Sequence, residues 1–89
     1  MNENHAAEVF RALSVPSRMQ ILLLLKSSGP LPVKTIAESL DMTSPAVSQH
    51  LKVLRDAGWI EGEISGPATC YTLTRKNITW FRKITEEIF

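Results

Sequence analysis

The chain has one cysteine, no long apolar run and almost no net charge, and each shortage excludes a class of protein. Cys70 alone cannot form an intrachain disulfide or a zinc site built from several thiolates. The longest apolar run, residues 21–25, is far shorter than the roughly 20 residues of a membrane span, so we expect no membrane partner. A net charge of +1 over 89 residues excludes a polycation built for bulk nucleic-acid or membrane binding.

The sequence also lacks the marks of an enzyme and of a targeting peptide. It contains no glycine-rich phosphate loop, no recognisable paired-carboxylate catalytic site and no Cys/His nucleophile spacing, so we expect neither catalysis nor a cofactor. Residues 1–5 have neither a basic start nor an apolar stretch, which predicts a cytoplasmic protein. With 44% apolar and 21% charged residues, the chain can fold as one domain over residues 1–89.

Apolar spacing and capping signals predict five helices and one β-hairpin. The helices are predicted over residues 4–13, 16–27, 33–40, 44–57 and 77–89, the strands over residues 59–64 and 69–73, and a short extended connector over residues 31–33. Thr43 or Ser44 can cap the fourth helix, and Gly58 suits a left-handed position at its end. This mainly α order, with two helices joined by a short turn ahead of a hairpin, is typical of a winged helix-turn-helix.

The fourth predicted helix has two chemically different faces. At about 100° per residue, Val47, Leu51 and Leu54 share one face and are expected in the core. The opposite face carries Pro45, Ser48, Gln49, Lys52 and Asp56, with His50 at the boundary. Hydroxyl, amide and imidazole groups can pair with base edges in the DNA major groove. Any solvated helix can carry such residues, so this face alone does not identify DNA binding.

Three segments resemble the ArsR family of bacterial repressors. Residues 43–58, TSPAVSQHLKVLRDAG, resemble the recognition helix of that family. Residues 10–22, FRALSVPSRMQIL, are similar to its junction between the first two helices, and residues 68–73, ATCYTL, to its returning wing strand. The resemblance implies a homodimeric winged-helix repressor that binds a palindromic operator in double-stranded DNA and is released by an inducer.

The resemblance also implies where the dimer interface and the DNA contacts lie. The first and last helices would form the interface through Ala6, Val9, Phe10, Ile78, Trp80, Phe81, Ile84 and Ile88. The alternative is that both helices pack on the core of their own subunit. For DNA, we expect base edges to be contacted by Ser44, Ser48, Gln49 and His50, with Pro45 at the same interface. We expect phosphates to be contacted by Lys52 together with Thr43 or Thr35. Ser65 and Gly66 should approach the minor groove.

The sequence departs from the family at its known metal sites. The family has a cysteine pair on its third helix, whereas residues 31–35 here hold no thiol and include Lys34. Its other site uses histidines of the C-terminal helix, and residues 77–89 contain none. We therefore predict no metal and an unknown, non-metal signal.

Cys70 is the remaining candidate sensor. Strand alternation places Tyr71 and Leu73 on one face and Cys70 and Thr72 on the other, so an inward Tyr71 leaves the thiol exposed to oxidation. No second cysteine is available to resolve an oxidised thiol, and no basic residue lies within four positions. These features favour a passive residue over a redox sensor.

The predicted wing is acidic, which argues against DNA binding. Glu61 and Glu63 have no cation near them in residues 61–69, and residues 32–73 hold three Lys/Arg against five Asp/Glu. Phosphate neutralisation supplies most non-specific DNA affinity, so that affinity should be weak. The rival hypothesis is a winged-helix protein-interaction module that does not bind DNA. Because the Ser48, Gln49 and His50 face favours DNA, we predict a sequence-specific transcriptional regulator.

Overall fold

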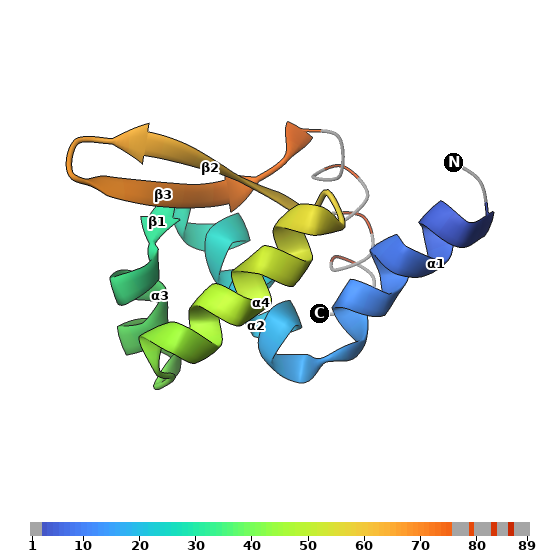
Figure 1. The fold of residues 1–89 in the computed structure, drawn as a ribbon, viewed down its shortest axis with the longest axis horizontal. Helices are drawn as coiled ribbons and strands as arrows, with labels where there is room; N and C mark the ends of the chain where they lie inside the picture. The colour runs from blue at the N-terminus through green and yellow to red at the C-terminus, as the bar shows by residue number, and fades with distance from the viewer. Residues whose placement is uncertain (1–2, 76–78, 80–82, 84–85, 87–89) are drawn as a thin grey trace.

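The computed structural model describes residues 3–75, 79, 83 and 86. The helical segments are α1 (Glu3–Arg11), the 3-10 turn η1 (Ala12–Ser14), α2 (Pro16–Ser28), α3 (Val33–Leu40) and α4 (Ser44–Asp56), and the strands are β1 (Leu31–Pro32), β2 (Ile60–Ser65) and β3 (Ala68–Leu73) (Figure 1). Most of the predicted helix over residues 77–89, including Ile78, Trp80, Phe81, Ile84 and Ile88, lies outside the described residues. Within the described part of the chain, no helix is long and apolar enough to span a membrane.

The helices α2, α3 and α4 pack together beneath a small antiparallel sheet, and α1 extends away from them (Figure 1). The strand order is β1-β3-β2. The connector predicted over residues 31–33 is in part a strand, because Leu31 pairs with Tyr71 and Pro32 with Cys70. Proline is accepted there because β1 is an edge strand. Two residues are too few to show an alternating pattern, so this pairing could not be predicted.

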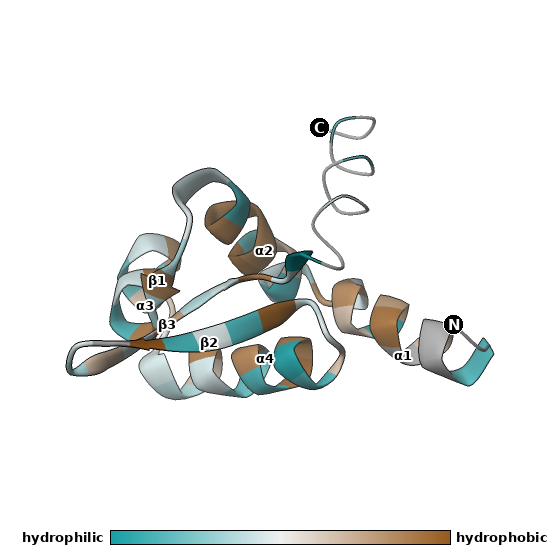
Figure 2. Cartoon of the chain, turned by 90° about the horizontal axis from the view of Figure 1, so that it is seen from above, coloured by the Kyte–Doolittle hydropathy of each residue, from teal (hydrophilic) through white to brown (hydrophobic). Residues whose placement is uncertain are grey.

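Among the described residues, buried side chains from α1, η1, α2, α3 and α4 form one core with Trp59, Ile60 and Leu73. From α2 it takes Ile21, Leu22 and Leu25, and from α4 Val47, Leu51 and Leu54. Apolar residues predominate in α2, whereas hydrophilic and apolar residues alternate along α4 (Figure 2). Leu23 and Leu24 of α2 are half-buried at the edge of this core.

Local hydrogen bonds fix both ends of α4. The Thr43 side-chain oxygen accepts from the Ala46 N–H at 3.3 Å, which confirms Thr43 as the N-cap. At the other end, Gly58 has φ of +85°, and its N–H donates to the Arg55 carbonyl at 3.0 Å. The Trp59 N–H donates to the Leu54 carbonyl at 2.9 Å, completing a Schellman motif.

Trp59 belongs to the cap that follows α4 and not to the strand, so the predicted strand start at residue 59 is wrong. Its N–H is used by the cap of α4, and β2 begins at Ile60. The indole is 1% exposed, and its Nε1–H donates to the Val9 carbonyl at 2.7 Å. Trp59 therefore joins α1, α4 and the base of the hairpin in one buried contact.

Candidate nucleic-acid interface

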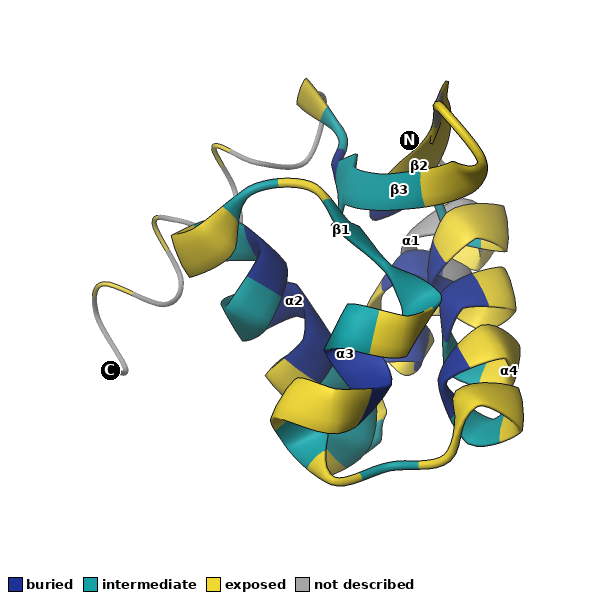
Figure 3. Ribbon diagram, turned by 90° about the vertical axis from the view of Figure 1, so that its left-hand side faces the viewer, coloured by how far each residue is buried: buried dark blue, intermediate teal, exposed yellow. Residues whose placement is uncertain are grey.

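The exposed side of α4 gathers five of the predicted DNA-binding residues. Ser44, Pro45, Ser48, Gln49 and Lys52 are all exposed. The opposite side is held in the core, and Figure 3 shows the two sides of α4 as separate exposed and buried stripes. The helix therefore presents hydroxyl, amide and ammonium groups from a rigidly packed element, as direct reading of base edges requires.

His50 has a partner that the sequence did not indicate. The Arg18 side chain on α2 donates from Nε to His50 Nδ1 at 3.3 Å, across 32 residues of sequence. Burial, assisted by the positive charge of Arg18, lowers the pKa of His50 below its usual value. The neutral ring thus accepts at Nδ1 and keeps its proton on Nε2. His50 is half-buried, so it ties α4 to α2 and offers only Nε2 to another partner.

Lys52 and Asp56 form an ion pair on the exposed side of α4. The Lys52 Nζ lies 3.5 Å from Asp56 Oδ2, and both side chains are largely exposed. Such a pair stabilises a protein by only about 0–1 kcal/mol. Lys52 can therefore leave Asp56 for a phosphate at small cost.

The turn between α3 and α4 is set by Asp41. Asp41 has φ of +53°, and the Met42 N–H donates to the Ala37 carbonyl at 2.9 Å, which closes the end of α3. A left-handed aspartate is tolerated there because its short polar side chain costs less than a branched one. This turn places exposed Thr43 at the N-terminus of α4, while Thr35 is half-buried on α3.

The wing, defined as the β2–β3 hairpin, keeps its carboxylates on one face. Ile60 pairs with Leu73, and because both are buried they define the inner face. By alternation, the inner face continues with Gly62, Tyr71, Ile64 and Thr69, whereas Glu61 and Glu63 share the outer face with Thr72 and Cys70. The acidity predicted for the whole wing is therefore one-sided.

The inner face of the wing is closely packed at its middle and exposed at its end. A Cβ added at Gly62 would lie 3.0 Å from Thr69 Cγ2 and 3.3 Å from Tyr71 Cε1, so a side chain at this position would crowd the strand opposite. Beyond this point Ile64 is 87% exposed. Gly66 has φ of +64° at the tip and is exposed, whereas the side chain of Ser65 lies outside the described residues.

Cys70 is half-buried, which corrects the expectation of an exposed thiol. Cys70 lies between Pro32 of β1 and Glu63 of β2 in the sheet. The unpredicted strand β1 thus flanks it on the side that a two-stranded hairpin would leave open. Among the described residues, no group of three or more His, Cys, Asp or Glu side chains is arranged to hold a metal ion.

The predicted dimer residues of α1 divide between core and surface. Val9 is 3% exposed and belongs to the core of its own chain, so its assignment to the interface is corrected. Phe10 is 43% exposed. The side chain of Ala6 lies outside the described residues. Of these predicted residues, Val9 thus faces the core and Phe10 the surface.

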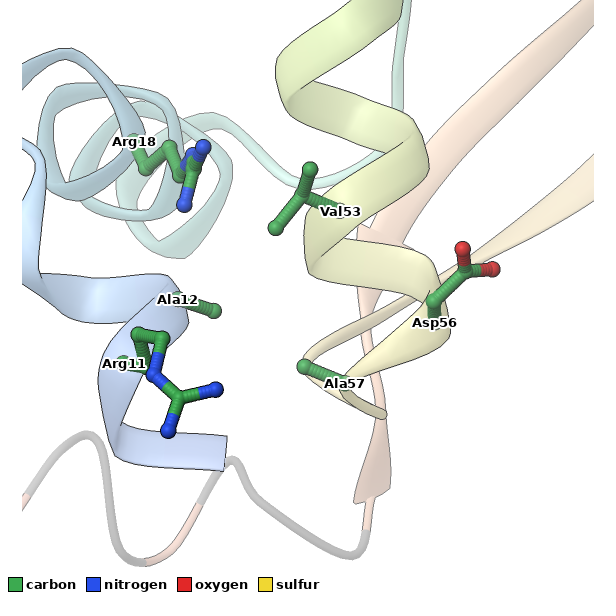
Figure 4. Close-up of a pocket in the computed structure, with 6 residues that line it drawn as sticks. All are labelled: Arg11, Ala12, Arg18, Val53, Asp56 and Ala57. Atoms are coloured by element: carbon green, nitrogen blue, oxygen red, sulfur yellow. The ribbon is translucent and has the colours of Figure 1, made fainter. Parts of the chain in front are cut away.

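A groove of about 260 Å³ opens beside α4, between that helix and the segments that precede it. It is lined by Arg11, Ala12, Arg18, Val53, Asp56 and Ala57 (Figure 4). None of these residues was predicted to bind DNA or to lie at the dimer interface.

Known proteins resemble this chain in both sequence and fold. Residues 15–61 match the family model described as bacterial regulatory protein, arsR family. The HTH-type transcriptional regulator NmtR of Mycobacterium tuberculosis is 43% identical over 67 residues, covering 75% of this chain and 55% of that protein. The arsenical resistance operon repressor of Escherichia coli is 32% identical over 80 residues, covering 90% of this chain and 68% of that protein.

A solved structure shows the same fold. The homodimeric winged helix-turn-helix DNA-binding domain of Mb0332 from Mycobacterium bovis, a possible ArsR-family transcriptional regulator, superposes with a TM-score of 0.86. It is 26% identical, and the match covers 96% of this chain and 78% of that one. The fold is thus a winged helix-turn-helix, and the chain spans little more than half the length of NmtR. From the sequence match and the shared fold, this chain belongs to the arsR family of bacterial regulatory proteins.

Proposed function

We propose that this chain is a sequence-specific DNA-binding transcriptional regulator, which acts as a homodimeric repressor. The observation that carries the proposal is the exposed polar side of α4, where Ser44, Ser48, Gln49 and Lys52 stand opposite a fully buried apolar side. An α-helix of this kind fits the major groove of B-DNA. The relatives named as transcriptional regulators and repressors support the same conclusion.

Each exposed group has a chemical role in this proposal. Ser44, Ser48 and Gln49 contact base edges, and Gln49 is suited to a bidentate contact with adenine. Lys52, Thr43 and Thr35 contact phosphates, which position the helix without reading sequence. His50 holds α4 against α2 through Arg18 and offers Nε2–H to the DNA. Ser65 and Gly66 at the wing tip approach the minor groove.

The acidity of the wing argues against DNA binding less strongly than the sequence suggested, because its carboxylates lie on one face only. Glu61 and Glu63 lie on the outer face, whereas the exposed end of the inner face carries Ile64 and Thr69. In Figure 3 the exposed side of α4 and the exposed end of the hairpin lie on the same side of the domain. The wing then contributes few released counterions, so binding depends more on base contacts than on charge.

A two-fold homodimer would place two copies of α4 on a palindromic site. Half-sites would be about 10–10.5 base pairs apart, because successive major grooves on one side of B-DNA are one turn apart. The Mycobacterium bovis domain, which is homodimeric, supports this arrangement. The signal that releases the DNA is then not a metal ion bound by the known cysteine or histidine sites, because this chain lacks their ligands.

The test is a fluorescence-anisotropy titration of the protein against DNA from upstream of its own gene and against a scrambled duplex. At about 50 and 200 mM salt, we expect tight binding to the upstream duplex only, with two chains per site. Equally weak binding to both duplexes would contradict the proposal and favour a protein-interaction module.

A further inference from the structure

The groove beside α4 has the chemistry of a small-molecule site. Its volume of about 260 Å³ lies just below the roughly 300–1,000 Å³ that ligand pockets occupy, so it suits only a small ligand. Three parts of the chain line it: the end of α1 with η1, the first turn of α2, and the last turns of α4. A molecule bound there would touch the proposed DNA-reading helix along the edge of its DNA-facing side.

The charges around the groove are unequally distributed. Arg11 and Arg18 bring two guanidinium groups from one side, and Val53 and Ala57 bring methyl groups from the other (Figure 4). The Asp56 carboxylate is directed away from the groove in Figure 4, and it lies 3.5 Å from Lys52 Nζ. The interior of the groove is therefore cationic on one wall and apolar on the other.

We propose that this groove binds a small amphipathic organic anion, with its acidic group on Arg11 and Arg18 and its apolar part against Val53 and Ala57. Arginine side chains bind carboxylates and similar oxyanions through two parallel N–H bonds. A bare phosphate would satisfy the guanidinium groups but would leave the wall formed by Val53 and Ala57 in contact with water. The apolar wall thus favours an acid with a hydrocarbon part.

Arg18 connects this groove to the recognition helix. Its Nε–H already donates to His50 at 3.3 Å, which is near the long limit for a hydrogen bond. A ligand that draws the guanidinium into the groove lengthens this contact and loosens the tie between α2 and α4. The bound anion also contacts α4 directly through Val53 and Ala57. If the proposed DNA-binding function is correct, on which this step rests, an occupied groove lowers DNA affinity.

The site itself is tested by NMR titration of the whole chain with sodium hexanoate, which has one carboxylate and a short apolar chain. Hexan-1-ol and inorganic phosphate at matched ionic strength are the controls for the apolar part and the charge. We expect saturable shifts of the Val53 and Ala57 methyl signals, with hexanoate binding at least about ten-fold more tightly than either control. Equal binding of phosphate or of hexanol, or no saturable shift, would overturn the proposal.

Matched arginine variants separate a defined site from general attraction of anions. Arg11 is exposed and lines the groove, so Arg11→Gln should fold normally and weaken hexanoate binding about ten-fold, as loss of a charge-assisted contact predicts. Arg55 is exposed on α4 but does not line the groove, so Arg55→Gln should leave binding unchanged. An equal loss in both variants would show long-range attraction only and would overturn the site.

The effect on DNA is tested by repeating the anisotropy titration with saturating hexanoate. We expect DNA affinity to fall by about five-fold or more, and bound DNA to weaken hexanoate binding by the same factor, because coupling between two sites is reciprocal. Unchanged DNA affinity with the groove saturated would overturn the link to DNA. If the ligand-free protein shows no specific DNA binding, the proposed function fails and the link fails with it, whereas the NMR result still decides the site.

Discussion

Helix α4 and the wing each have two chemically distinct faces. The two elements differ in how far along their length one of these faces is buried. The buried side of α4 runs its whole length through Val47, Leu51 and Leu54, so the other side is exposed throughout and polar. The wing is buried only at its base, through Ile60 and Leu73, and its far end projects from the domain (Figure 1).

The difference between α4 and the wing predicts which of the two supplies affinity and specificity for DNA. The exposed side of α4 carries hydrogen-bonding groups and Lys52, whereas the exposed end of the wing carries Ile64 on one face and Glu63 on the other. On the proposed function, we therefore expect base reading and phosphate contact to be concentrated in α4. The wing would then contribute mainly through the fit of its apolar side chains, since such side chains can enter the minor groove without neutralising phosphate.

Removing the residue that joins the two regions should have the largest effect. Trp59→Ala deletes a buried side chain that packs between α1, α4 and β2, and it leaves the Val9 carbonyl without its partner. We expect a loss of about 3–5 kcal/mol in the free energy of unfolding, measured by urea denaturation. Trp59→Phe keeps most of the volume and should lose less, and equal losses in the two variants would contradict the packing argument.

Gln49→Ala should weaken specificity without changing stability. Its side chain is exposed, so the urea midpoint should stay as in the parent protein. Discrimination between operator variants should fall by about 1–3 kcal/mol if Gln49 makes a bidentate contact to adenine. Ile64→Ala is the matched change on the wing, and it should alter discrimination less. A larger effect at Ile64 would reverse the assignment of reading to α4.

Charge changes on the two elements should differ in their salt dependence. Lys52→Ala should weaken binding to all sequences alike and reduce the slope of log affinity against log salt by about one unit, because one phosphate contact is lost. Glu63→Gln lies on the outer face of the wing and should leave that slope unchanged. If Glu63→Gln changes the slope as much as Lys52→Ala does, the outer face of the wing lies against the DNA.

Stability should fall modestly in acid through His50, which is expected to be the smallest effect. Folding lowers the pKa of His50 below the value of about 6.5 in the unfolded chain. Below that pH the unfolded chain binds more protons than the folded one, so the free energy of unfolding decreases as the pH falls towards the folded pKa.

The check compares urea midpoints of the parent and His50→Gln at pH values above and below about 6.5. Only the difference between the two proteins reports on His50, because carboxylates titrate in both. Parallel pH profiles would contradict the prediction, because they would show that folding does not change the pKa of His50.

The sequence alone determined helices α2 to α4, within one residue at their ends, and the faces of α4. Helix α3 occupies residues 33–40 as predicted, Thr43 caps α4, and Gly58 ends it in a left-handed conformation. These features depend on residues within about one helical turn of each other, so spacing and capping rules suffice. The exposed positions of Ser48, Gln49 and Lys52 follow from the same periodicity.

The tertiary structure decided everything that depends on distant partners. The Trp59 indole meets the Val9 carbonyl across 50 residues, and Arg18 meets His50 across 32. The pairing of β1 with β3 made Cys70 half-buried. The groove exists only because the end of α1 with η1 and the first turn of α2 meet α4. No local pattern encodes these contacts, because each depends on how elements far apart in the chain pack around a shared core.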